Sequence, residues 1–294
     1  MSKIAIMTDS NSGISRQEAK ERGIHLVPMP FTIDEVNYLE GVNLNQDQFF
    51  EFLEKKAVVQ TSQPSPADVI DLYKRLLNTH DEVLYIPMSS GLSGSCQTAH
   101  MLASEEPFEN KVFVVDNQRI SVTQRQSVLD ALELAERGMS ASEIRDILIK
   151  DKFNCSIYIM MDTLYYLKRG GRITPAAAAV GTILKIKPVL QIQGEKLDAY
   201  AKARTREQGK KIMLEALKKD IETRFGGLDA HTNERVQLHL AYTRDLAAEQ
   251  ELGDEMMEAF PGLDRPEIFP LSLSIACHTG PGALGVGVSQ KLKV

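Results

Sequence analysis

Residues 82–95 read EVLYIPMSSGLSGS, an apolar strand followed by a loop of serines and glycines. A helical pattern follows over residues 96–104. Strand signals at residues 3–7 and 111–116 are likewise followed by helical patterns. Repeated βα units predict a mostly parallel sheet covered by helices on both faces. Ligands bind beyond the carboxyl ends of such strands, where Thr8, the 89–95 loop and Asn117 are expected to gather.

The segment TSQPSP at residues 61–66 separates two helical patterns. It cannot be helical before Ser65, because each proline biases its predecessor toward extended backbone. Ser65 and Pro66 then form a typical helix start, which predicts a helix to about residue 78. A serine capping box at residues 140–143 predicts a further helix to residue 150.

The pattern changes after residue 153. Two strands over 187–193 and 196–203, joined by Gly194-Glu195, have the alternation and turn residues of an antiparallel hairpin. The other predicted elements are a strand at 155–161, a helix at 163–168, an alanine-rich helix from Thr174-Pro175, helices at 205–224 and 245–260, and strands at 236–243 and 267–271. The fold class is therefore α/β, with an N-terminal mostly parallel α/β domain over residues 1–154 and a C-terminal α+β domain over residues 155–294.

Composition excludes several classes of function. The chain has 34 basic and 40 acidic residues and a formal net charge of -6, which argues against a nucleic acid partner. Cys96, Cys155 and Cys277 are too widely separated for a metal motif and favour a reducing, cytoplasmic location. The longest apolar run, residues 176–184, is about half the length that a membrane-spanning helix needs.

The candidate sites leave alternatives open when each is taken alone. The 89–95 loop lacks the lysine of a phosphate-binding P-loop. Ser93 could be a nucleophile with His278 as its base, but the second glycine, Gly94, stands one place early for a nucleophile elbow. A plain helix-entry turn, a rigid proline connector at 61–66 and a surface turn at His278 are equally ordinary readings. Arg169 and Arg172 could be a solvated helix end or a fork for an anion.

Seven motifs taken in order resemble the DegV family over essentially the whole chain. They are IAIMTDS from Ile4, TSQPSP from Thr61, SSGLSGS from Ser89, VVD from Val114, YLKRGGRI from Tyr166, KART from Lys202 and HTGPGALG from His278. The resemblance implies two domains with one long-chain fatty acid buried between them, the residues near 272–285 returning to the interdomain site. It also implies that the fatty-acid carboxylate is held by Thr61, Ser62, Ser93, Gly94, His278 and Thr279.

The same resemblance implies a protein that is not an enzyme on its own and needs no metal or cofactor. It would be the fatty-acid-binding subunit of a two-component fatty acid kinase. A separate ATP-binding subunit would phosphorylate the bound carboxylate, and an acyltransferase would use the acyl phosphate in phospholipid synthesis, with transient contact to a membrane surface. Arg169 and Arg172 would face the kinase or the transferred phosphate.

Apolar residues of the second domain are expected to line the acyl tunnel: Ile159, Met161, Leu164, Ile183, Ile186 and Leu190. Two alternatives to the kinase subunit stay open. One is a stand-alone lipid sensor or regulator, and the other is a serine hydrolase or acyltransferase that uses Ser93 and His278.

Overall fold

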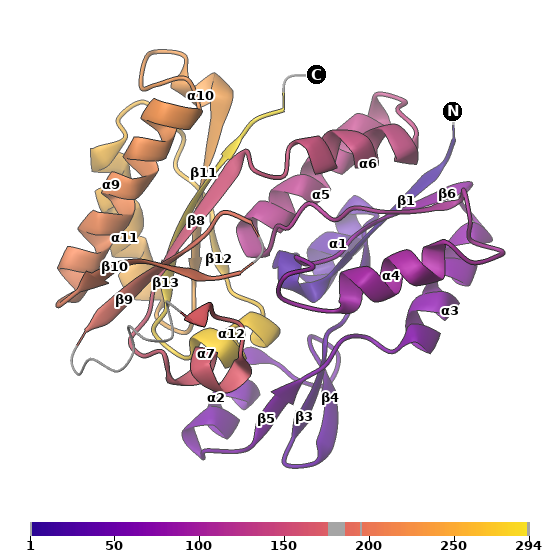
Figure 1. Cartoon of the computed structure of the whole chain (residues 1–294), viewed down its shortest axis with the longest axis horizontal. Coiled ribbons are helices and arrows are strands. Elements are labelled where there is room, and N and C mark those ends of the chain that lie inside the picture. Colours follow the sequence, from indigo (N-terminus) through magenta and orange to yellow (C-terminus); the bar gives the residue numbers. More distant parts are fainter. Residues whose placement is uncertain (1, 176–185, 195, 293–294) are drawn as a thin grey trace. The chain divides into compact units, whose positions relative to one another are not determined.

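The computed structural model describes residues 2–175, 186–194 and 196–292, and it divides into two compact units (Figure 1). The first unit comprises Met1–Lys152 and the short segment Ser272–Ser274. The second comprises Phe153–Leu271 and Ile275–Val294. Residues 176–184 of the predicted alanine-rich helix, and Glu195 of the predicted hairpin turn, lie outside the described residues.

A parallel four-stranded sheet in the order β2-β1-β6-β7 forms the centre of the first unit. Helices α3 and α4 pack on the face that carries Met7 and Tyr85, and α5 and α6 cover the other face (Figure 1), as the repeated βα pattern predicts. The elements are β1 Ile4–Asp9, η1 Ser10–Ser12, α1 Arg16–Arg22, β2 His25–Val27, α3 Pro66–Leu77, β6 Glu82–Ile86, α4 Ser95–Ala103, β7 Val112–Val114, α5 Ser121–Glu136 and α6 Ala141–Lys150.

The sequence analysis did not predict a second, antiparallel sheet in this unit. It has the order β4-β3-β5, with β3 Pro30–Ile33, β4 Val36–Leu39, β5 Val59–Thr61 and the adjoining helix α2 Gln46–Glu54. β2 and β3 follow each other closely in the sequence but belong to different sheets. Pro28 and Met29 separate them, and Pro28 ends β2 because proline has no N–H for a sheet hydrogen bond.

Two predicted helix starts are confirmed in detail. The N–H of Asp68 donates to Ser65 Oγ at 3.1 Å, and Pro66 is the first residue of α3. Ser140 and Glu143 form the reciprocal capping box of α6. These starts follow from local chemistry, so they can be predicted without knowledge of the tertiary fold.

The second unit is built on a six-stranded mixed sheet in the order β10-β9-β8-β13-β11-β12. The predicted hairpin is confirmed as the antiparallel pair β9–β10, and only β11 and β12 run parallel among its described strand pairs. The elements are β8 Cys155–Met160, α7 Tyr165–Gly170, β9 Lys187–Ile192, β10 Asp198–Ala203, α9 Arg206–Arg224, α10 Thr232–Arg235, β11 Val236–Tyr242, α11 Leu246–Ala259, β12 Ile268–Pro270, α12 Leu273–Thr279 and β13 Leu284–Gln290.

One face of this sheet is covered by α9 and α11. Met160, Val189 and Leu240 from the strands pack with Met213 of α9 and Leu252 of α11 in one buried cluster. Because side chains alternate along a strand, residues adjacent to these in sequence lie on the opposite face of the sheet. That opposite face includes Ile159 and Leu190, which are paired across β8 and β9.

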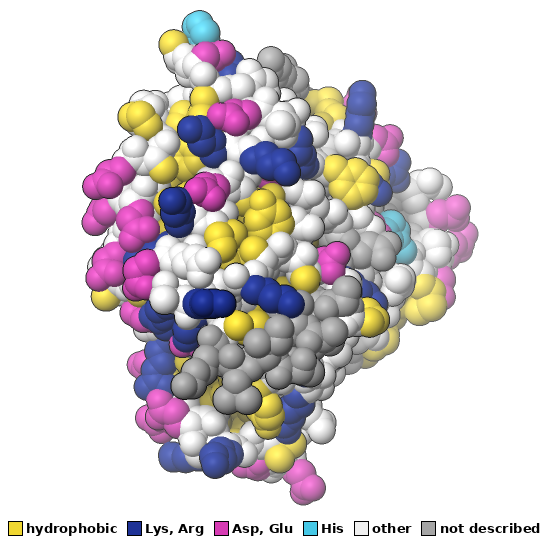
Figure 2. Space-filling model, turned by 60° about the vertical axis from the view of Figure 1, so that its left-hand side comes forward, with side chains coloured by type: hydrophobic (Ala, Val, Ile, Leu, Met, Phe, Trp, Pro, Cys, Tyr) yellow, Lys and Arg dark blue, Asp and Glu magenta, His cyan; other side chains and the backbone are white. Residues whose placement is uncertain are grey.

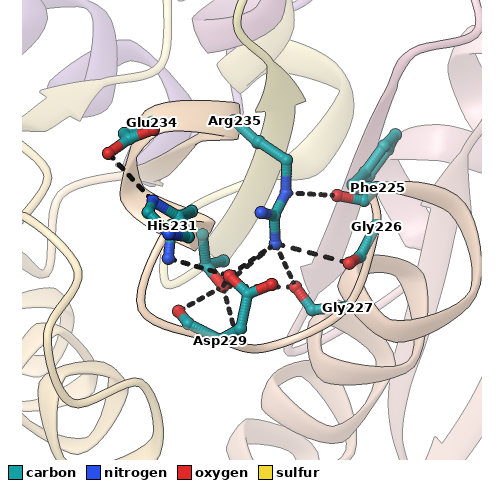
Figure 3. A network of polar contacts seen from close by, with 8 residues as sticks. Phe225, Gly226, Gly227, Asp229, His231, Glu234 and Arg235 are labelled. Carbon is teal, nitrogen blue, oxygen red and sulfur yellow. Dashed lines mark hydrogen bonds and ion pairs between the residues drawn. The ribbon is translucent and has the colours of Figure 1, made fainter.

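Arg235 organises the connection from α9 to β11 (Figure 3). Its Nε donates to the carbonyl of Phe225 at 3.2 Å, and its Nη2 donates to the carbonyl of Gly227 at 2.9 Å. The same Nη2 pairs with Asp229 at 3.0 Å. The guanidinium thus stabilises the turn that follows α9 by hydrogen bonds to two of its backbone carbonyls.

The surface mixes both signs of charge. Figure 2 shows lysine and arginine side chains interspersed with aspartate and glutamate over the face that it presents. No described helix is long and apolar enough to cross a membrane.

Candidate functional site

The serine-rich loop after β6, residues 89–95, is shaped by hydrogen bonds within its backbone and by a hydrogen bond between Met88 and Asp9. The carboxylate of Asp9, at the end of β1, accepts a hydrogen bond from the N–H of Met88 at 2.8 Å. The N–H groups of Leu92 and Ser93 both donate to the carbonyl of Ser89, at 3.0 and 3.2 Å. The loop therefore turns tightly from the end of β6 and brings Ser93 to the start of α4.

Ser93 has the geometry of a hydrogen-bond donor for an anion. Its Oγ accepts from the N–H of Ser95 at 3.2 Å, and the side chain is half-buried. Since a hydroxyl has one hydrogen and two lone pairs, this bond leaves the hydrogen available for an acceptor. The adjacent first turn of α4 favours negative charge through its amide groups.

The predicted segments at Thr61 and Ser93 meet within the first unit. Thr61 ends β5 and is half-buried, and Ser62 is exposed. Gln63 Oε1 accepts a hydrogen bond from Thr98 Oγ1 of α4 at 3.3 Å, and a Cβ added at Gly94 would lie only 2.9 Å from the same oxygen. This contact of Gln63 could not be predicted from the sequence, because a glutamine before a proline indicates no particular partner.

His278 lies in the last turn of α12, in the second unit. Its imidazole packs so closely on Gly170 that a Cβ there would overlap the ring. Burial, with a smaller contribution from the positive charge of Arg172, lowers the pKa of His278 to about 4. The imidazole is therefore neutral at pH 7, so it can donate from one ring nitrogen and accept at the other.

Thr279 and the following glycines form the end of α12. Thr279 is buried, and its hydroxyl donates to the carbonyl of Ile275 at 3.4 Å. Gly280 has φ +74°, and its carbonyl accepts from Thr243 Oγ1 at 2.7 Å. A Cβ at Gly280 would overlap the ring of Tyr166, so the left-handed turn and the close packing both require glycine here.

Arg169 and Arg172 flank the end of α7. Arg169 is exposed, whereas Arg172 is half-buried and donates through Nη1 to the carbonyl of Gly170. Gly171, at φ +67°, ends the helix. Arg172 is thus the arginine whose charge acts on His278. Gly170 belongs to the motif YLKRGGRI, but the motif alone does not indicate that this glycine contacts His278.

The described candidates for the acyl tunnel are mostly buried. Ile159, Met161, Leu164 and Leu190 are at most 5% exposed, and Ile186 is half-buried. Ile183 lies outside the described residues. Tunnel contact stays a prediction for each of them.

The chemistry of His278 does not favour a serine hydrolase. A general base is most effective when its pKa is near the working pH. An imidazole whose pKa has fallen to about 4 is a weak base at pH 7. Donation of a hydrogen bond to an anion is the role that the imidazole of His278 supports better.

Comparisons with known proteins give a consistent family. The model of the DegV family, described as an uncharacterised protein family, matches residues 3–291. A DegV domain-containing protein of Staphylococcus aureus is 30% identical over 291 residues, covering 99% of this chain and 100% of the relative. Protein DegV of Bacillus subtilis is 30% identical over 286 residues, covering 96% and 98%.

Solved structures agree with the sequence relatives. A fatty-acid-binding DegV family protein from Thermus thermophilus superposes with a TM-score of 0.88 at 30% identity, covering 98% of this chain and 100% of that one. DegV of Bacillus subtilis, described as a fatty acid binding protein, superposes with a TM-score of 0.85 at 27% identity, covering 99% and 100%.

Proposed function

This chain belongs to the DegV family, and on that premise we propose that it binds one long-chain fatty acid and presents the carboxylate to a separate ATP-dependent kinase subunit. The observation that carries the fatty-acid part of the proposal is the match, over nearly the whole chain, to two solved relatives that bind fatty acids. The hydrogen-bond donors at Ser93 and His278 add chemical support.

The carboxylate half of the proposal rests on hydrogen-bond donors. A carboxylate that is buried away from water needs hydrogen-bond donors for its lone pairs. Without them its burial costs several kcal/mol, because the lost hydration is not replaced. Ser93 and the first turn of α4 supply such donors in the first unit. Thr61 and Ser62 directly precede Gln63, which is hydrogen-bonded to α4. In the second unit, the neutral imidazole of His278 supplies another. Thr279 follows it in the sequence, and its hydroxyl hydrogen is donated to the carbonyl of Ile275.

The acyl chain would supply most of the affinity. Burial gains about 0.8 kcal/mol per methylene, so roughly fourteen methylenes would gain on the order of 11 kcal/mol before ordering costs. In the six-stranded sheet of the second unit, the apolar face that carries Ile159 and Leu190 is suitable for lining the acyl tunnel. Gly285 and Gly287 of β13 alternate with valines and place no side chain on that face.

The kinase half of the proposal assigns the chemistry to a partner. A carboxylate oxygen of the bound fatty acid would attack the terminal phosphorus of ATP, the bond from that phosphorus to the leaving ADP oxygen would break, and an acyl phosphate would form. Arg169 and Arg172 would stabilise the transferred phosphoryl group or contact the partner, since a guanidinium pairs well with phosphate oxygens. A downstream acyltransferase would then consume the acyl phosphate.

Binding is tested by isothermal titration of the delipidated protein with oleic acid and with oleyl alcohol, which lacks the carboxylate. Loss of one hydrogen bond to a charged group costs about 1.5–3 kcal/mol, so Ser93→Ala and His278→Ala should each weaken oleic acid binding roughly 10- to 150-fold. Ser104→Ala removes an exposed serine at the end of α4 and serves as the matched control. Equal affinities of wild type and both variants would refute the carboxylate assignment.

Presentation to a kinase is tested with the kinase subunit from the same genome, ATP and hydroxylamine, which converts an acyl phosphate to a stable hydroxamate. We expect hydroxamate only when both proteins are present, and much less with Arg169→Ala or Arg172→Ala although both variants still bind oleic acid. Tight binding with no hydroxamate from any cognate kinase would contradict the kinase role and favour a lipid sensor.

A further inference from the structure

Helix α12 connects two parts of the molecule. Its first residues, Leu273 and Ser274, belong to the first unit, and its last residues, His278 and Thr279, belong to the second. Whatever fixes the first turn of this helix therefore acts on the segment that carries the proposed ligand contacts of the second unit.

Glu40 caps the first turn of α12. It follows β4 directly, is half-buried, and its Oε1 accepts a hydrogen bond from the N–H of Leu273 at 2.5 Å. The backbone N–H of Ser274 also acts on this carboxyl. Its other oxygen, Oε2, lies 2.6 Å from Ser10 Oγ. A side chain distant in sequence thus satisfies amide groups that a helix start leaves without partners.

Asn11 fastens the same segment beside Glu40. Its Oδ1 accepts from the hydroxyl of Ser272 at 3.1 Å and from the hydroxyl of Ser274. Its Nδ2 donates to Asp9 Oδ1 at 3.0 Å, and Asn11 is fully buried. Residues 272–274 are therefore hydrogen-bonded to two side chains, Glu40 and Asn11, that are not among the proposed ligand contacts.

We propose that Glu40 is a positioning residue of the fatty-acid site: its carboxyl fixes the first turn of α12, and the last turn of that helix then presents His278 and Thr279. This inference rests on the proposed function. It adds a group that touches no ligand and lies far from His278 in the sequence.

Glu40 also makes the cap sensitive to pH. Burial raises the pKa of Glu40 to about 7, and the charge of Asp9 adds to the rise, while hydrogen bonds from Ser10, Leu273 and Ser274 oppose it. Of these groups that act on Glu40, Asp9 of β1 is the one with a charge. Burial raises the pKa of Asp9 as well. A protonated Glu40 keeps Oε1 as an acceptor and can donate from Oε2 to Ser10.

The sign of the pH effect follows from proton linkage. A glutamate released from the cap into water has an ordinary pKa, 4.5, and the capped glutamate has a pKa of about 7. The capped state thus binds the proton more tightly, so the cap is fully stable below pH 4.5 and weakens as the pH rises through about 7, by at most about tenfold per pH unit.

Two substitutions separate the hydrogen bonds from the charge. Glu40→Gln keeps an oxygen for the N–H of Leu273 and an amide that can donate to Ser10, and it does not titrate. Glu40→Ala removes both contacts. Glu51→Gln and Glu51→Ala are matched controls, because Glu51 is an exposed glutamate of α2 in the same unit, with its side chain 66% exposed.

The experiment measures oleic acid affinity of the five delipidated proteins at about pH 6 and about pH 8.5, and amide hydrogen exchange of the peptide that covers α12. We expect Glu40→Ala to bind roughly tenfold or more weakly and to exchange faster at α12, and Glu40→Gln to restore both. The affinity of wild type relative to Glu40→Gln should fall as the pH rises, a ratio in which ionisation of the fatty acid itself cancels.

Unchanged affinity and exchange in Glu40→Ala, with wild type binding oleic acid, would overturn the positioning role alone. The same holds if Glu40→Gln is as weak as Glu40→Ala, because the cap requires an acceptor and not a charge. If wild type binds no fatty acid, the proposed function itself fails, whereas the exchange measurement still reports on the cap.

Discussion

Gly170→Ala should displace His278 while leaving the fold intact. Gly170 is the last residue of α7, and a Cβ there would overlap two ring atoms of His278, Nδ1 and Cε1. Gly170 lacks the positive φ of its neighbour Gly171, so the alanine backbone is not strained. The added methyl group therefore acts on the ring rather than on the helix.

The size of the effect can be worked from these contacts. Alanine favours a helix over glycine by up to about 1 kcal/mol, and one extra methyl in a packed site costs about 1–3 kcal/mol, so the free energy of unfolding should change by no more than about 2 kcal/mol. If the displaced imidazole loses its hydrogen bond to the carboxylate, fatty-acid affinity should fall roughly 10- to 150-fold.

A double-mutant cycle with His278→Ala provides the assay. Gly170→Ala should weaken oleic acid binding in wild type and have almost no further effect once the imidazole is absent. Gly171→Ala is the neighbouring control: its Cβ meets no atom within 4 Å, and its φ of +67° costs about 1–2 kcal/mol of stability without loss of affinity. Additive losses from Gly170→Ala and His278→Ala would refute the reasoning.

Two further predictions concern buried charges. Burial raises the pKa of Glu249 well above 4.5, against the opposing effect of nearby backbone N–H groups and Lys210, so the folded state holds the proton and stability should fall as the pH rises above 4.5. Glu249→Gln should flatten that dependence in urea unfolding across pH, and an unchanged slope would contradict this. Arg119 Nη2 and Asp151 Oδ2 form a buried ion pair at 2.6 Å, so Asp151→Ala should lower the free energy of unfolding by about 3–5 kcal/mol, and a loss below about 1 kcal/mol would show that the pair is dispensable.

Local signals explain which parts of the fold could be predicted. Ser65 and Ser140 start helices through hydrogen bonds that span only three residues, so the sequence contains the complete signal. The sheet of β3, β4 and β5 could not be foreseen, because its strands have only three or four residues and helix α2 separates β5 from the other two. Helix α12 was missed for a similar reason: it is a single short helix of seven residues whose start is fixed by Glu40.

The candidate site shows the same division. Ser93 and His278 stand in motifs with glycines, which the resemblance to a family makes visible. Glu40 stands in none of these motifs, and the motif that contains Gln63 does not indicate its contact with α4. The hydrogen bond between Glu40 and Leu273 spans 233 positions of the sequence. Contacts of this kind depend on the tertiary fold and carry no signal in the neighbouring residues.

Native mass spectrometry of the protein purified without added lipid, followed by organic extraction, tests fatty-acid binding most directly. Because acyl burial is worth on the order of 11 kcal/mol before ordering costs, the ligand should survive purification. We predict one additional mass per chain that equals a long-chain fatty acid, recovered in the extract and reduced in Ser93→Ala. A ligand-free mass that persists after incubation with several fatty acids would contradict the account.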